Sequence, residues 1–309
     1  MNRAYSLLMV ILFILVSCQE KSHHIEPMTY SGELSSGTID SYVDFPSKYV
    51  RARNVDVWLP QNYNPSESYQ VLYMHDGQML FDAKTTWNKQ EWKVDEHLGE
   101  LLSNNEVPPT IVVAVWNHAD IRWNEYFPIK AGQQGLNQIN NQTDYKQFID
   151  GPHYADDYLK FLVEELKPFI DHKYAVKSDM EHTFIAGSSM GGLISMYAIC
   201  EYPEVFSAAA CLSTHWIGVH NLKEANPVPE SFLTYFKANF PVDGKHKIYF
   251  DFGTETLDAE YLIYQPMVDT IINEMKIKAI NKGFEGHDHS ENSWNLRLDE
   301  PLKFILNDE

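Results

Sequence analysis

Short apolar runs alternate with amphipathic stretches along most of this chain. Buried strands are predicted where β-branched, aromatic and small apolar residues cluster, at 71–74, 110–115, 183–186, 205–212 and 247–252. Helices are predicted where apolar residues recur at helical spacing, at 92–102, 153–170, 231–240 and 261–280, with a last helix ending at Leu306. Strands separated by helices favour right-handed crossovers and a largely parallel sheet covered on both faces, which is an α/β fold.

The N-terminal part of the chain has a different pattern. Arg3 precedes an apolar run, Leu7–Val16, which is too short to span a bilayer stably. The run ends in Leu15-Val16-Ser17-Cys18, which resembles the bacterial lipoprotein box. This predicts a lipoprotein signal peptide over residues 1–18 and an exported protein anchored through lipidated Cys18, on a periplasmic or cell-surface face. An ordinary secretory signal with an incidental cysteine is the alternative.

The remaining chain is predicted to contain a tether and one domain. Residues 19–36 are polar and predict a flexible tether, so the domain is expected over 37–309. It opens with alternating segments at 38–45 and 52–59, which predict an antiparallel pair. The Gln- and Asn-rich stretch 131–149 predicts a loop insertion near a site mouth.

One motif carries the clearest chemistry. Gly187-Ser188-Ser189-Met190-Gly191 matches G-x-S-x-G and lies between a predicted strand and a predicted helix, the context of a nucleophile elbow. Ser189 is therefore the candidate nucleophile, and the Met190 amide is a candidate donor to an oxyanion. A glycine-rich turn without catalytic function is the alternative.

The loop after the predicted strand 71–74 reads His75-Asp76-Gly77-Gln78. An α/β-hydrolase places its second oxyanion amide in such a loop, so Gly77 and Gln78 are the candidates for that donor. His75 and Asp76 either contact substrate or hold a turn.

Two further loops carry candidate substrate contacts. The 116–128 loop follows a predicted strand and is rich in aromatic and polar residues, so it is expected at the sheet edge that carries the site. Asn117, Arg122 and Glu125 are candidates there, although an Arg122–Glu125 ion pair that pins the loop is the alternative. Trp216, in a later loop, either lines the pocket or packs within that loop.

A serine nucleophile needs a general base, normally a histidine that a carboxylate orients. In the α/β-hydrolase order, acid and histidine follow the nucleophile. The chain offers Glu255 or Asp258 as the acid and His287 or His289 as the base. The two histidines flank Asp288 and could instead bind a metal, but no further ligand pair with metal-site spacing is evident. We therefore expect a serine mechanism without a metal or another cofactor.

These segments resemble the "putative esterase" family of α/β-hydrolases, which includes enterochelin, feruloyl and acetyl-xylan esterases, esterase D and mycolyltransferases. The resemblance covers about 55–306 and rests on Y-M-H-D-G-Q from Tyr73, G-S-S-M-G-G from Gly187, G-T-E-T-L-D from Gly253 and E-G-H-D-H-S-E-N-S-W from Glu285. It implies an α/β-hydrolase fold, a three-layer α/β/α sandwich with a mostly parallel sheet.

The resemblance also implies roles for individual residues. Ser189 matches the nucleophile. The base stands five residues before a tryptophan in similar members, which is His289 before Trp294, whereas other members place it directly after the glycine, which is His287. The acid lies about thirty residues before the histidine, which suits Asp258. The implied substrate is a siderophore ester or a feruloyl or acetyl ester of a carbohydrate. An acyltransferase, or a non-catalytic lipoprotein that binds carbohydrate or siderophore, is the alternative.

Composition narrows the possible partners. The chain has 43 acidic against 24 basic residues, a net charge of -19, and no Lys/Arg cluster. Because phosphate binding needs concentrated positive charge, we expect no nucleic acid partner.

Cys200 and Cys211 lie in apolar segments and are expected to be buried free thiols.

Overall fold

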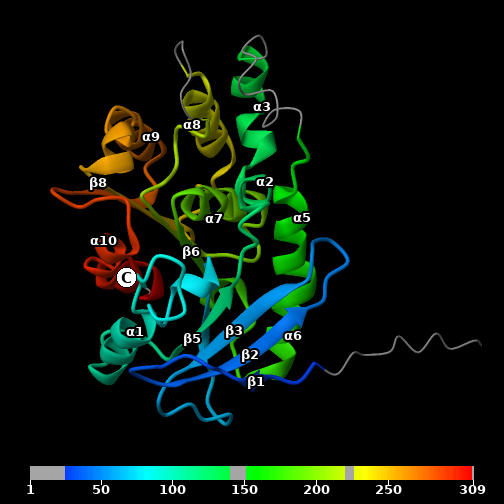
Figure 1. Ribbon diagram of the computed structural model, residues 1–309. Coiled ribbons are helices and arrows are strands. Elements are labelled where there is room, and N and C mark those ends of the chain that lie inside the picture. Colours follow the sequence, from blue (N-terminus) through cyan, green and yellow to red (C-terminus); the bar gives the residue numbers. More distant parts are fainter. Residues whose placement is uncertain (1–24, 140–150, 220–225, 308–309) are drawn as a thin grey trace, which may run out of the picture.

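The computed structural model describes residues 25–139, 151–219 and 226–307. At the centre of the protein is a sheet with the strand order β1-β2-β3-β5-β4-β6-β7-β8-β9 (Figure 1). The pairs β1–β2, β2–β3 and β3–β5 are antiparallel, and every other neighbouring pair is parallel. The strands are β1 Met28–Thr29, β2 Thr38–Phe45, β3 Arg53–Leu59, β4 Gln70–His75, β5 Thr110–Val115, β6 Thr183–Ser188, β7 Ala208–Leu212, β8 Lys247–Gly253 and β9 Lys278–Phe284. The sheet is therefore largely parallel, as predicted.

Helices cover both faces of the sheet. In Figure 1, α5 and α6 lie on one side of it, and α1 and α10 lie on the other. The helices are α1 Val94–Ser103, α2 Arg122–Tyr126, α3 Ile129–Gln138, α5 Ala155–Lys160, α6 Lys167–Lys173, α7 Met190–Glu201, α8 Val228–Asn239, α9 Gln265–Met275, α10 Glu291–Asn295 and α11 Asp299–Leu306. A π-helical turn, η3 Phe161–Leu166, joins α5 to α6, and short 3₁₀ turns are η1 Gly77–Met79, η4 Met180–His182 and η5 Thr256–Tyr261.

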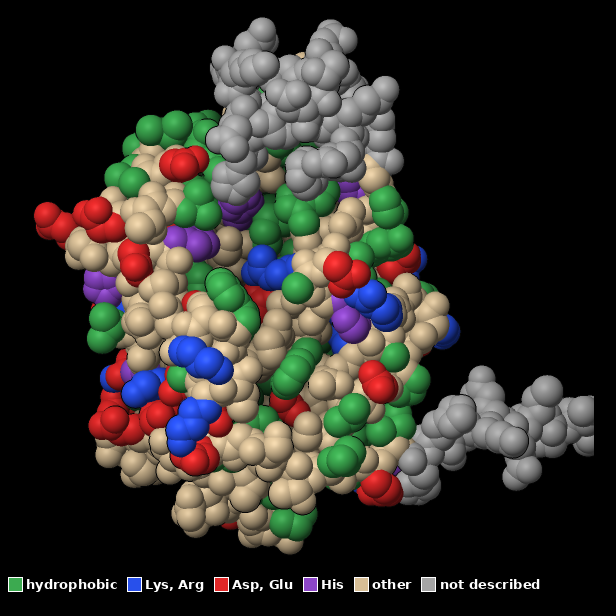
Figure 2. All heavy atoms as spheres, viewed as in Figure 1, with side chains coloured by type: hydrophobic (Ala, Val, Ile, Leu, Met, Phe, Trp, Pro, Cys, Tyr) green, Lys and Arg blue, Asp and Glu red, His purple; other side chains and the backbone are tan. Residues whose placement is uncertain are grey.

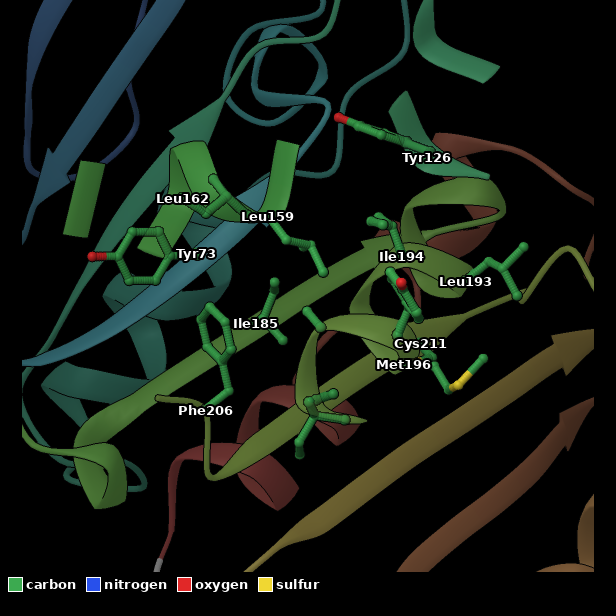
Figure 3. Packing of buried hydrophobic residues seen from close by; sticks show 14 of the residues in the cluster. Tyr73, Tyr126, Leu159, Leu162, Ile185, Leu193, Ile194, Met196, Phe206 and Cys211 are labelled. Carbon is green, nitrogen blue, oxygen red and sulfur yellow. The ribbon is translucent and has the colours of Figure 1, made fainter. Parts of the chain in front are cut away.

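The strand side chains divide between two hydrophobic cores because successive residues of a strand point to opposite faces. In β4, Val71 and Tyr73 belong to one core, and Leu72 and Met74 belong to the other. Figure 3 shows part of the first core, where Tyr73 and other sheet residues pack with residues of η3 and α7. This arrangement confirms the predicted three-layer α/β/α architecture, in which every central strand is buried on both sides.

The predicted helix 261–280 is wrong at its C-terminal end. Helix α9 stops at Met275, Lys276 takes a left-handed conformation with φ 54°, and the chain continues as β9. Strand β9 pairs only with β8 in the sheet order. Its alternating exposed positions carry Lys278 and Lys282, which is why it lacks the apolar signature of a central strand.

The predicted loop insertion 131–149 is wrong where the structure describes it, because 129–138 forms α3. Two glycines let this helix approach its neighbours closely. A Cβ on Gly135 would lie 2.6 Å from the Val228 Cα, and one on Gly132 would lie 2.7 Å from the ring of Phe127. The glycine-rich, polar composition thus serves helix packing, and residues 140–149 lie outside the described part.

The predicted tether also ends earlier than expected. Strand β1 pairs with β2, the amides of Ser35 and Ser36 donate to Asp95, and the Ser36 carbonyl accepts a hydrogen bond from the Trp58 indole. These contacts attach 28–36 to the domain, so the domain begins before residue 37. The signal peptide and Cys18 lie outside the described residues.

Two further findings concern the thiols and the helices. Cys200 and Cys211 are buried and free, as predicted. None of the helices within 25–139, 151–219 and 226–307 combines the length and the apolar composition that a bilayer crossing requires.

Candidate active site

The turn between β6 and α7 holds Ser189 in a strained backbone conformation, with φ 58° and ψ -121°. Such a conformation costs a non-glycine residue about 1–3 kcal/mol and persists only where its surroundings enforce it. Here the Ser189 amide donates to the Leu212 carbonyl at 2.8 Å. A Cβ on Gly187 would lie 2.7 Å from the carbonyl carbon of Gly191, so the tight crossing of strand and helix requires glycine at 187. This is the geometry of a nucleophile elbow.

A histidine and an aspartate form a close pair beside this turn. His289 Nδ1 and Asp258 Oδ1 are 2.5 Å apart, with Asp258 fully buried and the His289 side chain 14% exposed. Burial raises the pKa of Asp258, but hydrogen bonds from His289, Ser213 and the Gly253 amide outweigh it and hold this pKa below its ordinary value. Asp258 therefore remains a carboxylate that can orient an imidazole.

The two alternative residues make other contacts. The His287 ring donates to the Ser293 carbonyl at 3.3 Å, while its own carbonyl accepts hydrogen bonds from the amides of Thr254 and Glu255. The Glu255 side chain is exposed. Of the four candidate acids and bases, the structure brings Asp258 and His289 together.

Ser189 and His289 line the same cavity, whose volume is about 350 Å³. Its wall combines three tryptophans with polar and charged side chains from separate parts of the chain. The lining residues are Asp76, Gln78, Met79, Trp87, Trp92, Asn117, Ala119, Arg122, Ser188, Ser189, His289, Glu291 and Trp294. Trp92 and Trp294 are buried with ring centroids 5.4 Å apart, whereas Trp87 is 83% exposed. The cavity thus presents a serine and an imidazole to any molecule that binds against the tryptophans.

The loop that contains η1 contributes Asp76, Gln78 and Met79 to the cavity wall. Asp76 takes a left-handed conformation with φ 57°, and a Cβ on Gly191 would lie 3.4 Å from its Oδ2, so this loop contacts the elbow. A Cβ on Gly77 would lie 2.6 Å from the backbone of Ala114, which explains the glycine there. Gln78 lines the cavity, and its Oε1 accepts a hydrogen bond from the Asn117 amide.

A model of the family described as "Putative esterase" matches residues 47–305. The chain belongs to this family. It is 24% identical to the endo-1,4-beta-xylanase/feruloyl esterase of Xylanibacter ruminicola over 209 residues, which is 66% of this chain and 25% of that protein. The chain spans between 25% and 62% of the length of four curated relatives that it matches.

Solved structures of esterases have the same fold. A ferulic acid esterase superposes with a TM-score of 0.62 at 19% identity, covering 88% of this chain and 98% of the other. The enterobactin esterase of Shigella flexneri gives a TM-score of 0.61 at 17% identity, covering 90% of this chain and 60% of the other. These likenesses establish the α/β-hydrolase fold of this esterase-family protein.

In this esterase-family protein, Asn117 and Arg122, which were predicted to contact substrate, both donate hydrogen bonds to the carboxylate of Asp76. Arg122 donates to both oxygens of Asp76, at 2.8 and 2.6 Å, and Asn117 Nδ2 donates to Oδ1 at 2.6 Å. Burial raises the pKa of Asp76, but the facing guanidinium outweighs it and holds this pKa below its ordinary value. The alternative Arg122–Glu125 pair is wrong, because Glu125 is buried against Arg53. Asp76 thereby joins the η1 loop to α2.

His75 and Trp216 are not among the residues that line this cavity, and their contacts are those of the alternative interpretations, a residue that holds a turn and a residue that packs within its loop. His75 lies beneath the elbow, where its Nδ1 and the Tyr158 hydroxyl are 2.8 Å apart, and burial lowers its pKa to about 3. Trp216 is buried with its ring 5.4 Å from that of Phe250. Both side chains support the backbone that carries the site.

Sequence reasoning missed three polar residues behind Asp258, namely Ser213, Asp251 and Arg297. An aspartate between the aromatic residues Phe250 and Phe252 of strand β8 is a signal that could have identified Asp251. The tryptophans of the cavity wall were missed as well. In the described part of the chain, no three His, Cys, Asp or Glu side chains gather as a metal site.

On the face shown in Figure 2, basic side chains are interspersed with acidic and polar ones rather than gathered in one patch.

Proposed function

We propose that this protein is a serine carboxylic ester hydrolase with Ser189 as nucleophile, His289 as general base and Asp258 as the acid. The observation that carries this proposal is the 2.5 Å His289–Asp258 pair, whose histidine lines the same cavity as a serine in the strained elbow conformation. Membership of the esterase family supports the same reaction.

The reaction follows from these positions. Ser189 Oγ attacks the ester carbonyl carbon while its proton passes to His289 Nε2, and the carbonyl oxygen becomes an oxyanion. The Met190 amide, at the start of α7, and an amide of the Gly77–Gln78 segment are the donors for this charge. The bond to the alcohol oxygen then breaks as His289 returns the proton to it. Water attacks the acyl-enzyme in the same manner and releases the carboxylic acid.

The cavity favours a neutral ester of an aromatic acid, such as a feruloyl ester of a carbohydrate. Trp87, Trp92 and Trp294 line it, and the exposed Trp87 ring can stack on a planar acyl group or a sugar. The described lining includes a single arginine, Arg122, and Asp76 already neutralises its charge at 2.6 Å. Glu291 adds a negative charge, so a strongly anionic siderophore ester is less well complemented.

A labelling experiment tests the reaction type. The full-length chain should react covalently with a fluorophosphonate probe, and Ser189→Ala should abolish both this labelling and ester hydrolysis. Ser195→Ala is a matched control, because Ser195 lies on α7, the helix that Ser189 precedes, and its hydroxyl donates to the Gly191 carbonyl within that helix. Labelling that survives Ser189→Ala would exclude the proposed nucleophile.

A substrate panel then tests the ester class. Methyl ferulate, an acetylated oligosaccharide and a catecholate trilactone should be hydrolysed in decreasing order of kcat/KM. Preference for the trilactone would overturn the substrate assignment while leaving the serine mechanism in place. Acyl transfer to an added sugar, in preference to water, would identify an acyltransferase.

We also propose that the protein is exported and anchored through lipidated Cys18, on the evidence of the sequence alone. Mass spectrometry of the purified protein should find residues 1–17 removed and acyl chains on Cys18. Cys18→Ser should release the protein from the membrane fraction. A mature chain that retains these residues, or starts elsewhere, would refute the anchor.

A further inference from the structure

The hydroxyl of Ser213 has a fixed hydrogen-bond direction. Ser213 follows β7 with a positive φ of 43°, and its Oγ accepts hydrogen bonds from Trp294 Nε1 at 2.9 Å and from Arg297 Nη2 at 2.8 Å. The same oxygen lies 2.6 Å from Asp258 Oδ2. Because two donors already point at Oγ, the hydroxyl proton is directed to Asp258.

A buried ion pair holds Ser213 in this position. Arg297 donates through Nε to Asp251 Oδ2 at 3.1 Å and through Nη2 to Asp251 Oδ1 at 2.9 Å, and the Ser213 amide also donates to Oδ1. The Arg297 side chain is 1% exposed and that of Asp251 is fully buried. Removing one partner of such a pair would leave an uncompensated charge in the interior.

Asp251, Asp258 and Arg297 together carry one net negative charge, which lies next to the His289 imidazole. Arg297 Nη2 lies 3.8 Å from Asp258 Oδ2, but Asp251 compensates the arginine directly. Oδ2 of Asp258 is occupied by Ser213 and by the Gly253 amide at 2.6 Å. Oδ1 therefore remains for His289, and the carboxylate plane is set by the donors on its other oxygen.

We propose that Ser213, held by the Asp251–Arg297 pair, is a positioning residue that keeps Asp258 ionised and its Oδ1 aimed at His289. None of these three residues touches substrate in this scheme, and each acts through Asp258. The catalytic meaning of the proposal rests on the proposed serine mechanism, but the electrostatic link can be measured without turnover.

The scheme predicts opposite effects for two substitutions. Ser213→Gly removes a donor from Asp258, so the negative charge concentrates on Oδ1 and protonation of the facing imidazole becomes easier. Asp251→Asn leaves Arg297 uncompensated near Asp258, so protonation of the imidazole becomes harder. A role limited to stabilising the fold would not move the two titrations in opposite directions.

The other groups near His289 are unchanged in both variants. Tyr261 of η5 has its ring centroid 5.8 Å from the His289 ring, Asp288 is its chain neighbour, and Arg122 and Glu291 line the same cavity. They contribute equally to each titration, so the difference between the variants reports on the Ser213 and Asp251 changes.

The first measurement is the pH midpoint of the His289 ring-proton NMR signal in the full-length chain, assigned by its loss in His289→Gln. Relative to wild type, we expect a higher midpoint in Ser213→Gly and a lower midpoint in Asp251→Asn. Glycine suits the positive φ at 213, so this variant is expected to fold. Thr214→Val is the matched control, because that neighbouring buried hydroxyl donates to the Cys211 carbonyl instead.

The second measurement is ester hydrolysis. Ser213→Gly should lower kcat about tenfold, as expected for the loss of a hydrogen bond to a charged group, with a much smaller change in KM. Midpoints that stay at the wild-type value, or that move in the same direction, would overturn the proposal. Because the NMR midpoint needs no turnover, an inactive wild-type protein would refute the proposed function separately.

Discussion

Asp258→Asn is the most informative single change at the candidate site. In the native structure the two oxygens of Asp258 have different partners: Oδ1 faces His289, while Oδ2 accepts from Ser213 and the Gly253 amide. Asparagine has the same shape but only one acceptor oxygen. Because two donors converge on the Oδ2 position, the asparagine oxygen takes that position, and its NH₂ group faces His289 Nδ1.

The consequence for His289 is a reversed tautomer. With an NH₂ group opposite it, Nδ1 must become the acceptor, so Nε2 carries the ring proton. A protonated Nε2 cannot take the proton from Ser189. Acid-to-amide replacement in a serine triad costs about 10⁴ in kcat, equivalent to about 5 kcal/mol of transition-state stabilisation.

The assay is the rate of acyl-enzyme formation with a chromogenic ester, measured together with kcat and with fluorophosphonate labelling. We expect the rate of acyl-enzyme formation and kcat each to fall on the order of 10³- to 10⁴-fold, while the thermal unfolding temperature stays near that of the wild type. Asp288→Asn is the matched control, because Asp288 is adjacent to His289 but accepts from Ser290 and Ser293 instead. A kcat for Asp258→Asn within about tenfold of wild type would refute the tautomer argument.

Three further predictions concern the cavity and the core. Trp87→Ala should raise KM for a feruloyl ester about tenfold with little change in kcat, because the exposed indole binds the ring without touching the reacting atoms. Arg122 holds the pKa of Asp76 below its ordinary value of 3.8, so the ionised carboxylate stabilises the folded protein at pH values above 3.8. This stabilisation is lost as the pH falls through the lower pKa of Asp76 in the folded state. Arg122→Gln should therefore move acid unfolding, followed by circular dichroism, to higher pH. Cys200 and Cys211, whose pKa values burial raises, should react with a thiol reagent only after unfolding.

Each of these predictions has a clear contrary result. Leu296→Ala, which alters another exposed apolar side chain, is the control for Trp87→Ala, and an equal rise of KM in both would remove the stacking role. An acid transition in Arg122→Gln at or below the wild-type pH would show that the guanidinium does not hold Asp76 ionised. Reaction of Cys200 or Cys211 in the native protein would contradict their burial.

Periodicity and local motifs predicted much of the fold. Strand β5 has the predicted bounds, and the elbow at Ser189 lies between β6 and α7 as its flanking residues indicated. Such features depend on neighbouring residues, because strand burial and the glycine requirement of a tight turn act over a few positions. Strand β9 was missed because pairing with β8, rather than its own composition, makes it a strand.

The pairing of side chains was decided by the tertiary structure. The sequence alone predicted an order of candidate nucleophile, acid and base, and it left two residues open for each of the last two roles. Asp258 and His289 are 31 positions apart, and Arg122 bonds Asp76 across 46 positions rather than Glu125 three positions away. A hydrogen bond requires atoms within about 3 Å and a suitable angle. Such a distance is set by how loops from different strands pack at one edge of the sheet, which no local pattern of residues specifies.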